Sequence, residues 1–247
     1  MESIIIQADS LTKKYGTATV LDNISLSISK SEIFGLIGPN GAGKSTFISI
    51  MATIIKPTSG SLIINGWNIR SHAAKIKPDI GFVPQEIALY PALSGLDNLR
   101  FWAGVYGLNG KLRDDRIDEA LEIAGLPDRA RDRVDRYSGG MKRRLNIAVA
   151  LLHHPSILVL DEPMVGVDIQ SRKYILDALK RLKDSGRTIV FASHYADEMK
   201  SLCDRLAVIN NGKVMASGTF ASLQRLTGRQ DMEDVLFSII NEDLAVH

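Results

Sequence analysis

A nine-residue stretch near the start of the chain has the composition of a phosphate-binding loop. It reads Gly38-Pro-Asn-Gly-Ala-Gly-Lys-Ser-Thr46 and directly follows the apolar segment 33–37. Glycines let consecutive backbone N–H groups turn toward an anion, and the N-terminus of a following helix adds partial positive charge. The residues expected to contact a bound nucleotide are Gly38, Asn40, Gly41, Gly43, Lys44, Ser45 and Thr46.

The side chains of this loop suit a nucleoside triphosphate with its magnesium ion. Lys44 would reach the β- and γ-phosphates, the Ser45 hydroxyl would be a ligand of Mg²⁺, and Thr46 would lie near the α-phosphate. A simple glycine turn between a strand and a helix is the alternative. The strand before the loop and the amphipathic helix after it favour phosphate, so we expect ATP and Mg²⁺ as the bound groups.

Two carboxylates follow a second apolar run. Asp161 and Glu162 come directly after residues 157–160, at the expected carboxyl end of a buried parallel strand. Asp161 would orient Mg²⁺ through its water shell, and Glu162 would polarise the attacking water. Taken alone, this pair could be a solvated strand end or a helix cap. Together with the phosphate loop, it predicts nucleotide hydrolysis.

A third stretch, Tyr137-Ser-Gly-Gly-Met-Lys-Arg-Arg-Leu145, contains a second helix start suited to anions. Ser138 is a good N-cap, and Gly139 and Gly140 leave the backbone accessible. The stretch resembles the signature of the ATP-binding cassette (ABC) family. This resemblance implies that two cassettes pair head to tail, with each ATP between the loop of one chain and the signature of the other. An ordinary capped helix with a basic surface is the alternative.

Four further residues match this family in order along the chain. Tyr15 corresponds to the aromatic residue that stacks on adenine, and Gln85 to the glutamine that contacts Mg²⁺ and the attacking water. Asp168 corresponds to the D-loop residue that crosses the dimer, and His194 to the switch histidine at the γ-phosphate. The resemblance therefore implies that Glu162, His194 and Gln85 are catalytic, and that Ser45, Gln85 and Asp161 hold the metal.

The elements that must position these residues follow from hydrophobic periodicity. Residues 24–29 alternate between apolar and polar and, with residues 4–6 and 61–64, predict a small antiparallel sheet whose turns contain Lys56-Pro57 and Gly60. Three continuously apolar runs predict buried parallel strands at residues 34–37, 157–160 and 188–192. Asn210-Asn211-Gly212, between residues 206–209 and 214–216, predicts a hairpin.

Helical spacing predicts that the phosphate loop opens a helix that stops before Pro57. Its buried stripe would be Phe47, Ile50, Met51 and Ile54. Similar stripes lie within residues 141–152 and 175–182, and we expect residues from about 87 to 154 to form a mostly helical insertion. The expected fold is α/β: a P-loop NTPase (RecA-like) core with a small antiparallel β subdomain and an inserted helical subdomain. One ATPase domain would cover residues 1–226, and a short helical tail residues 227–247.

Composition is that of a globular protein with no strong charge bias. The chain has 247 residues, 45% hydrophobic and 23% charged, with a net charge of +2 and one cysteine, Cys203. The small net charge gives no sign of a nucleic acid partner, and one cysteine cannot form an intrachain disulfide. Apolar runs fall short of the ~20 residues of a spanning helix, and the first residues lack a signal peptide pattern. We expect a cytoplasmic protein.

The ABC resemblance implies a subunit that hydrolyses ATP to drive transport, bound peripherally at the cytoplasmic face of a membrane. Its partners would be a second cassette and integral membrane permease subunits. The permease would insert a coupling helix beside residues 85–91, where apolar side chains include Ile87, Leu89, Tyr90 and Leu93. The signature style looks most like the ABC-2 export branch, which implies export of drugs, lipids or polysaccharides.

Two other functions have some sequence support. A soluble ABC ATPase acting on nucleic acid or ribosomes is suggested by the basic cluster Arg129, Arg131, Arg133, Arg136, Lys142, Arg143 and Arg144. Aspartates at positions 128, 132 and 135 are interleaved with it, which favours a solvated helical face or a phosphate-facing edge, so we expect no nucleic acid partner. A metabolite kinase would share only the phosphate loop and would have no use for the signature stretch.

Overall fold

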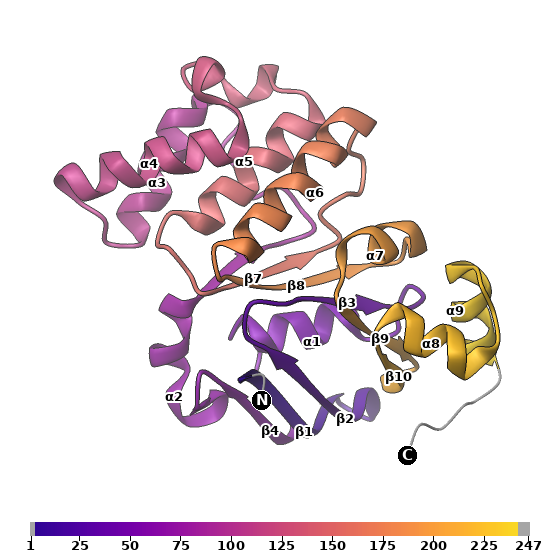
Figure 1. The fold of residues 1–247 in the computed structure, drawn as a ribbon. Coiled ribbons are helices and arrows are strands. Elements are labelled where there is room, and N and C mark those ends of the chain that lie inside the picture. Colours follow the sequence, from indigo (N-terminus) through magenta and orange to yellow (C-terminus); the bar gives the residue numbers. More distant parts are fainter. Residues whose placement is uncertain (1–2, 242–247) are drawn as a thin grey trace.

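The computed structural model describes residues 3–241, and a six-stranded sheet forms its centre. The strand order across this core sheet is β10 (Lys213–Gly218), β9 (Arg205–Asn210), β3 (Ile33–Ile37), β8 (Thr188–Ser193), β7 (Ile157–Asp161) and β6 (Ile80–Val83). All neighbours pair in parallel except β9 and β10, which form an antiparallel hairpin. Helices cover both faces (Figure 1), which explains why β3, β7 and β8 are buried throughout.

Most strands of the core sheet are those that the sequence predicts. The three apolar runs form β3, β7 and β8, and the predicted hairpin forms β9 and β10, with positive φ at Asn211 and Gly212. The sequence did not predict β6, which is only four residues long and includes Gly81. A Cβ at Gly81 would lie 2.3 Å from the carbonyl oxygen of Ala150. This glycine therefore allows the strand to pack closely against the helix that contains Ala150.

A second, antiparallel sheet has the strand order β2 (Ala18–Ser29), β1 (Ile4–Tyr15), β4 (Ser59–Ile64) and β5 (Trp67–Asn68). The predicted antiparallel sheet is therefore confirmed, with longer strands than expected. The assignment of Gly60 to a turn was wrong, because Gly60 lies inside β4. A Cβ at Gly60 would lie 2.2 Å from the carbonyl oxygen of Ser10, so glycine permits close contact with β1.

Helix α1 (Lys44–Met51) begins at the phosphate loop and packs between the two sheets (Figure 1). Phe47, Ile50 and Met51 are buried in the same cluster as both sheets, as predicted. Including Ile54 in this stripe was wrong, because the helix ends at Met51 and Ile54 is exposed. Thr53 adopts a positive φ just before it, which turns the chain out of the helix.

The middle of the chain supplies helices that pack on one another. α2 (Ile69–Ile76) precedes β6, and α3 (Gly95–Val105), α4 (Gly110–Ala124) and α5 (Gly139–Leu151) form the upper part of Figure 1. These last three helices share an apolar cluster of their own, to which Leu99, Leu121 and Leu145 contribute. The prediction that this region is mostly helical is confirmed.

Of the remaining helices, some cover the other face of the core sheet and the last two form the C-terminal part of the described chain. They are α6 (Ile169–Asp184), α7 (Ala196–Leu202), α8 (Phe220–Thr227) and α9 (Met232–Asn241). The predicted stripe within residues 175–182 is buried on α6. Residues 242–247 of the expected tail lie outside the described residues. Across residues 3–241, no helix combines the length and the apolar character needed to cross a membrane.

Candidate functional site

The phosphate loop has the backbone geometry of an anion site. Gly43, the residue before α1, has φ 107°, and no side chain described in the structure caps this helix. A Cβ at Gly43 would lie 2.7 Å from Leu21 Cδ2 and 2.9 Å from the Val20 carbonyl oxygen. Glycine is therefore required both by the backbone conformation and by space. The first N–H groups of a helix lack partners within it, so those of α1 remain available to a ligand.

A cavity of about 440 Å³ opens over this loop. Its lining consists of residues 40–46 together with Val20, Gln85, Glu162, Val165 and His194. A volume of this size suits a small-molecule ligand. The structure therefore brings together the loop and three separately predicted residues, Gln85, Glu162 and His194, although they are far apart in the sequence.

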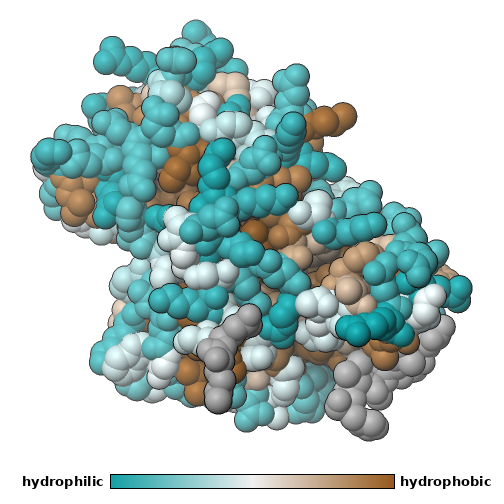
Figure 2. Space-filling model, in the orientation of Figure 1, coloured by the Kyte–Doolittle hydropathy of each residue, from teal (hydrophilic) through white to brown (hydrophobic). Residues whose placement is uncertain are grey.

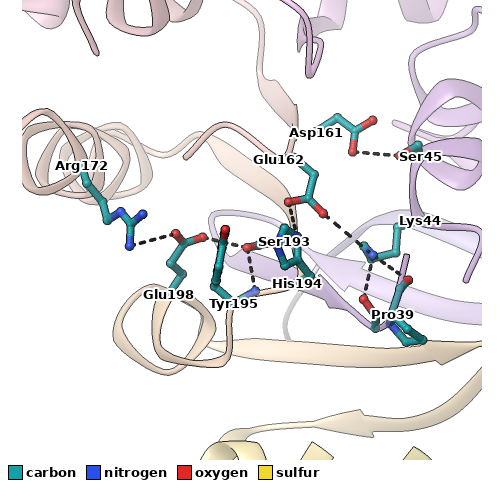
Figure 3. A network of polar contacts seen from close by, with 11 residues as sticks. Pro39, Lys44, Ser45, Asp161, Glu162, Arg172, Ser193, His194, Tyr195 and Glu198 are labelled. Atoms are coloured by element: carbon teal, nitrogen blue, oxygen red, sulfur yellow. Dashed lines mark hydrogen bonds and ion pairs between the residues drawn. The ribbon is translucent and has the colours of Figure 1, made fainter. Parts of the chain in front are cut away.

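Lys44 is held by the loop itself. Its Nζ donates hydrogen bonds to the carbonyl oxygens of Gly38 at 2.7 Å and Pro39 at 3.0 Å (Figure 3). It also lies 3.9 Å from Glu162 Oε1, and only 5% of its side chain is exposed. Burial lowers the pKa of Lys44, although Glu162 and Asp161 act against this shift. The ammonium group thus lies buried beside the cavity, and its nearest carboxylate oxygen is 3.9 Å away. Its charge is therefore free to pair with a phosphate group.

Ser45 and Asp161 form an oxygen pair that fits a magnesium ion. Ser45 Oγ donates to Asp161 Oδ1 at 3.2 Å, and Asp161 is buried at the end of β7. Burial raises the pKa of Asp161, while the bond from Ser45 and the charge of Lys44 oppose the shift. Hydroxyl and carboxylate oxygens are the hard ligands that Mg²⁺ takes when it binds through few protein groups and a phosphate. The residues present therefore fit the metal that the fold implies.

Glu162 and His194 lie side by side because adjacent parallel strands end at the same edge of the sheet. Glu162 Oε2 is 2.7 Å from His194 Nδ1, while its other oxygen faces Lys44 (Figure 3). The backbone N–H of Glu162 donates to the Ala192 carbonyl oxygen at 3.0 Å, and Glu162 has φ 48°. A left-handed conformation is unfavourable for a non-glycine residue. The hydrogen bond to β8 therefore holds the backbone of Glu162 in a strained conformation.

The signature residues lie elsewhere, beside the start of α6. Ser138 Oγ accepts a hydrogen bond from the Met141 N–H at 3.2 Å, which confirms it as the N-cap of α5. A Cβ at Gly140 would lie 2.1 Å from Ser171 Oγ and 2.7 Å from Asp168 Oδ2. Asp168 caps α6 by accepting the Ser171 N–H at 2.9 Å, and that bond lowers its pKa. The structure thus joins the signature to the D-loop, but neither lines the phosphate-loop cavity.

Tyr15 is the predicted site residue whose position says least about binding. It ends β1, is 51% exposed and does not belong to the cavity lining. The ammonium group of Lys13 lies 4.7 Å from its ring centroid. Conversely, Val20 and Val165 line the cavity but were not singled out from the sequence. Isolated valines carry no chemical signal, so only tertiary structure could find them.

The basic cluster of residues 129–144 is engaged largely within the chain. Arg129 pairs with Asp132 at 2.5 Å, and Arg133 pairs with Asp135 at 2.6 Å, as the interleaved aspartates suggested. Arg143 is buried and donates to the carbonyl oxygens of Pro84 at 2.9 Å and Gln85 at 2.7 Å. These contacts weaken the case for a nucleic acid surface. They also show a function that sequence reasoning missed, because Arg143 joins the signature helix to the backbone of Gln85.

Comparisons with known proteins agree with this geometry. Residues 21–165 match the family described as ABC transporter. The chain is 45% identical over 242 residues to the linearmycin resistance ATP-binding protein of Bacillus subtilis, covering 98% of this chain and 78% of that protein. It is 34% identical over 236 residues to a daunorubicin resistance ATP-binding protein of Streptomyces coeruleorubidus, covering 96% and 75% of the two chains.

A solved structure extends the likeness to a nucleotide-bound state. This structure is a dimeric ATP-binding cassette in a post-hydrolysis state bound to ADP and phosphate, and it superposes with a TM-score of 0.78 at 30% identity. The likeness covers 87% of this chain and 98% of that one. These comparisons give no support to a cassette acting on nucleic acid or ribosomes. The chain belongs to the ABC transporter family, as an ATP-binding subunit that hydrolyses ATP.

Proposed function

We propose that this chain drives export through an integral membrane permease, and that it does so as one of two paired cassettes. The observation that carries the proposal is the division of its binding groups. Lys44, Glu162 and His194 meet at one cavity, whereas the signature residues Ser138 to Gly140 lie outside it. Two anion-binding helix starts, of which only one lines this cavity, support a site shared between two chains.

The catalytic groups have distinct roles in this proposal. The backbone of Gly38, Asn40, Gly41 and Gly43 and the side chains of Lys44 and Thr46 hold the phosphates. Glu162 accepts a proton from the attacking water, and His194 steadies both this carboxylate and the γ-phosphate. The 2.7 Å contact between Glu162 and His194 and the buried Lys44 support these assignments.

Magnesium and adenine complete the proposed nucleotide site. Ser45, Asp161 and the Gln85 side chain would hold Mg²⁺, which when bound neutralises charge on the phosphate oxygens. Tyr15, exposed at the end of β1, would stack on adenine. From the second cassette, Ser138, Gly139, Gly140 and Asp168 would close over the ATP. An added Cβ at Gly140 would lie 2.7 Å from Asp168 Oδ2, and this closeness supports their acting as one surface.

An apolar surface on the helical part of the molecule suits the permease. Ile87, Tyr90 and Leu93 are exposed, and Phe101 and Val105 of α3 are exposed too. The rings of Tyr90 and Phe101 are in edge contact, with centroids 4.8 Å apart. Figure 2 shows hydrophilic residues over most of one face, with apolar side chains gathered in smaller areas. Such exposed apolar side chains support an amphipathic coupling helix as the occupant. We propose that this contact holds the chain at the cytoplasmic face of the membrane.

Leu89 differs from the other residues of this proposed surface because it is partly buried. Sequence reasoning grouped it with the exposed docking residues, but Leu89 packs against the apolar cluster of α3, α4 and α5. We therefore infer that Leu89 anchors the segment from inside while its neighbours face the permease.

The cassette would comprise residues 1–226, with the helical subdomain at about 87–154 and a short tail at 227–247.

We propose that transport runs outward and that the cargo is a drug, a lipid or a polysaccharide. The two relatives described above are named for resistance to linearmycin and to daunorubicin. Resistance to an antibiotic is the outcome expected when a transporter removes it from the cell. The chain covers more than two thirds of each of these relatives, which supports carrying the comparison to the whole subunit.

Replacing Glu162 with Gln tests this proposal. The substitution keeps the shape of the side chain but removes the proton acceptor, so hydrolysis should fall at least ~100-fold while ATP binding persists. Size-exclusion chromatography with ATP should then show a trapped dimer. Glu122→Gln, an exposed position on α4, is the matched control and should hydrolyse ATP normally. Native hydrolysis by Glu162→Gln would refute the role of Glu162, and recovery of the native chain from its membranes without a permease would refute the transport proposal.

A further inference from the structure

A buried polar pair, Ser193 and Glu198, lies beside His194 (Figure 3). Ser193 is the last residue of β8, and its Oγ donates to Glu198 Oε2 at 2.7 Å. The same Oγ accepts the backbone N–H of Tyr195 at 3.1 Å. His194 stands between Ser193 and Tyr195 in the chain. The backbone on both sides of His194 is therefore tied, through one hydroxyl, to the carboxylate of Glu198.

Glu198 occupies an unfavourable place for a carboxylate. It lies in the first turn of α7 with 4% of the residue exposed. Burial raises its pKa and the charge of Glu162 adds to this shift, whereas the bond from Ser193 and the charges of Arg172 and His194 oppose it. Within residues 3–241, Oε1 of Glu198 has no hydrogen-bond donor. A buried carboxylate that accepts a hydrogen bond on only one of its oxygens costs stability, so it calls for an explanation other than packing.

The second oxygen of Glu198 faces another part of the site. Arg172 Nη1 lies 3.6 Å from Oε1, and the Arg172 guanidinium lies 5.7 Å from the ring centroid of Tyr195. Arg172 is in the first turn of α6, where its backbone N–H donates to the Asp168 carbonyl oxygen at 2.8 Å. Glu198 is thus placed between the turn that carries His194 and the helix that begins at the D-loop.

We propose that Glu198 is a positioning residue for ATP hydrolysis, which holds the turn of residues 193–195 through Ser193 Oγ and ties it to α6 through Arg172. This inference rests on the role proposed above for His194. Glu198 does not line the phosphate-loop cavity and touches no reacting atom. It acts through His194, whose side chain is 33% exposed and has its short polar contact with Glu162.

A misplaced imidazole is the expected consequence of losing this anchor. The ring of His194 also contacts that of Tyr195, with centroids 4.0 Å apart, so movement of the turn would carry both rings. Misplacing a catalytic group by about 1 Å can cost up to ~100-fold in rate. The simpler explanation is that Glu198 only stabilises the start of α7 as an acidic residue in its first turn. Asp197, an exposed acidic neighbour in the same turn, provides the comparison.

The test measures kcat and KM for ATP in Glu198→Ala, Ser193→Ala and Asp197→Asn. We expect the first two to lower kcat about 10-fold with KM for ATP within about twofold, because positioning and not binding is lost. Asp197→Asn should match the native protein. Glu198→Gln, which keeps an oxygen that can accept from Ser193, should recover part of the lost kcat. Circular dichroism melting checks that each variant is folded. If Glu198→Ala does not fold, Glu198→Gln still tests the role of the carboxylate.

A double-mutant cycle with His194→Ala separates this inference from the proposed function. If Glu198 acts through His194, Glu198→Ala should lower kcat little further in the His194→Ala background. Losses that multiply would overturn the positioning role, as would a native kcat in Glu198→Ala and Glu198→Gln while His194→Ala is slow. A native kcat in His194→Ala would instead refute the proposed role of His194 and, with it, the inference about Glu198.

Discussion

The helices α1 and α5 both begin after glycine-containing segments, yet their starts are built differently. α1 follows Gly43 in a left-handed conformation, has no side-chain cap within the described part of the chain, and carries the buried cation Lys44. α5 is capped by Ser138, and its first turn lies beside Asp168 rather than beside a buried lysine. One start therefore supplies a buried charge and hydroxyl groups, and the other supplies mainly backbone N–H groups. Under the proposed function, we therefore expect ATP to bind first at α1 of one cassette, and α5 of the other cassette to act on a site already occupied.

The largest effect should come from removing the charge at α1. Lys44→Ala should weaken ATP binding by an isolated cassette about 100-fold, because a buried ammonium group that faces the phosphates is lost. Lys142→Ala, in the first turns of α5, is the matched control and should leave this affinity within about twofold. Equilibrium binding of a fluorescent ATP analogue measures both. Equal losses in the two variants would break the distinction between the helix starts.

A smaller effect, on hydrolysis alone, is expected at α5. In Gly140→Ala the new Cβ would collide with Ser171 Oγ and Asp168 Oδ2, so the signature and the start of α6 must separate. Hydrolysis should fall about 10-fold while the ATP affinity of the single cassette is retained. Gly139→Ala, whose Cβ would approach only the Gly166 carbonyl oxygen at 3.2 Å, should be milder. Loss of ATP affinity in Gly140→Ala would contradict the proposed separation of roles.

Burial of Glu198 predicts a pH-dependent difference in stability. Its pKa in the folded protein is raised above the ordinary value of 4.5, so the folded state binds the proton more tightly than the unfolded state. The contribution of Glu198 to stability is therefore present below that ordinary value and is lost as pH rises through the folded pKa. Relative to Glu198→Gln, the native protein should lose stability over this window. Thermal melting of both proteins from pH 4 to pH 8 measures it, and parallel curves would contradict the assignment.

The smallest expected effect concerns the cap that distinguishes the two helices. Ser138→Ala removes the acceptor for the Met141 N–H and should lower the free energy of unfolding by about 1 kcal/mol. Thr219→Ala removes the corresponding cap of α8, where Thr219 Oγ1 accepts the Ser222 N–H at 3.1 Å, and should cost a similar amount. Urea unfolding checks both. An additional loss of hydrolysis in Ser138→Ala alone would show that the cap also serves the ATP site.

Local sequence predicted the elements with strong patterns and failed where close packing decided the outcome. The strands β3, β7 and β8 were found because continuous apolar runs require burial on both faces. β6 was missed because its four residues include Gly81, which is explained only by the nearby Ala150 carbonyl. The end of α1 was placed too late because Ile54 fits the helical spacing, although the positive φ of Thr53 ends the helix before it.

The candidate site divides in the same way. Lys44 and Glu162 belong to local motifs, so their chemistry was evident from neighbouring residues. The sequence offered only a weak indication of Glu198, which is a carboxylate next to the apolar residue Met199. The structure shows that both residues are buried on α7. Nothing local linked it to Ser193 or Arg172. Arg143 was read as part of a basic surface, and only the structure showed that it is buried against the backbone of Pro84 and Gln85.

The sequence by itself determined the chemistry of the ATP site, because glycines, a lysine, hydroxyls and carboxylates at fixed spacing dictate what a strand-to-helix turn can bind. Tertiary structure decided which of these groups meet. Adjacent parallel strands bring Glu162 and His194 within 2.7 Å, and the packing of α5 against α6 places Gly140 beside Asp168, away from the phosphate loop. Such contacts depend on how strands and helices distant in the chain pack together, and the residues of each motif do not by themselves show which of these elements become neighbours.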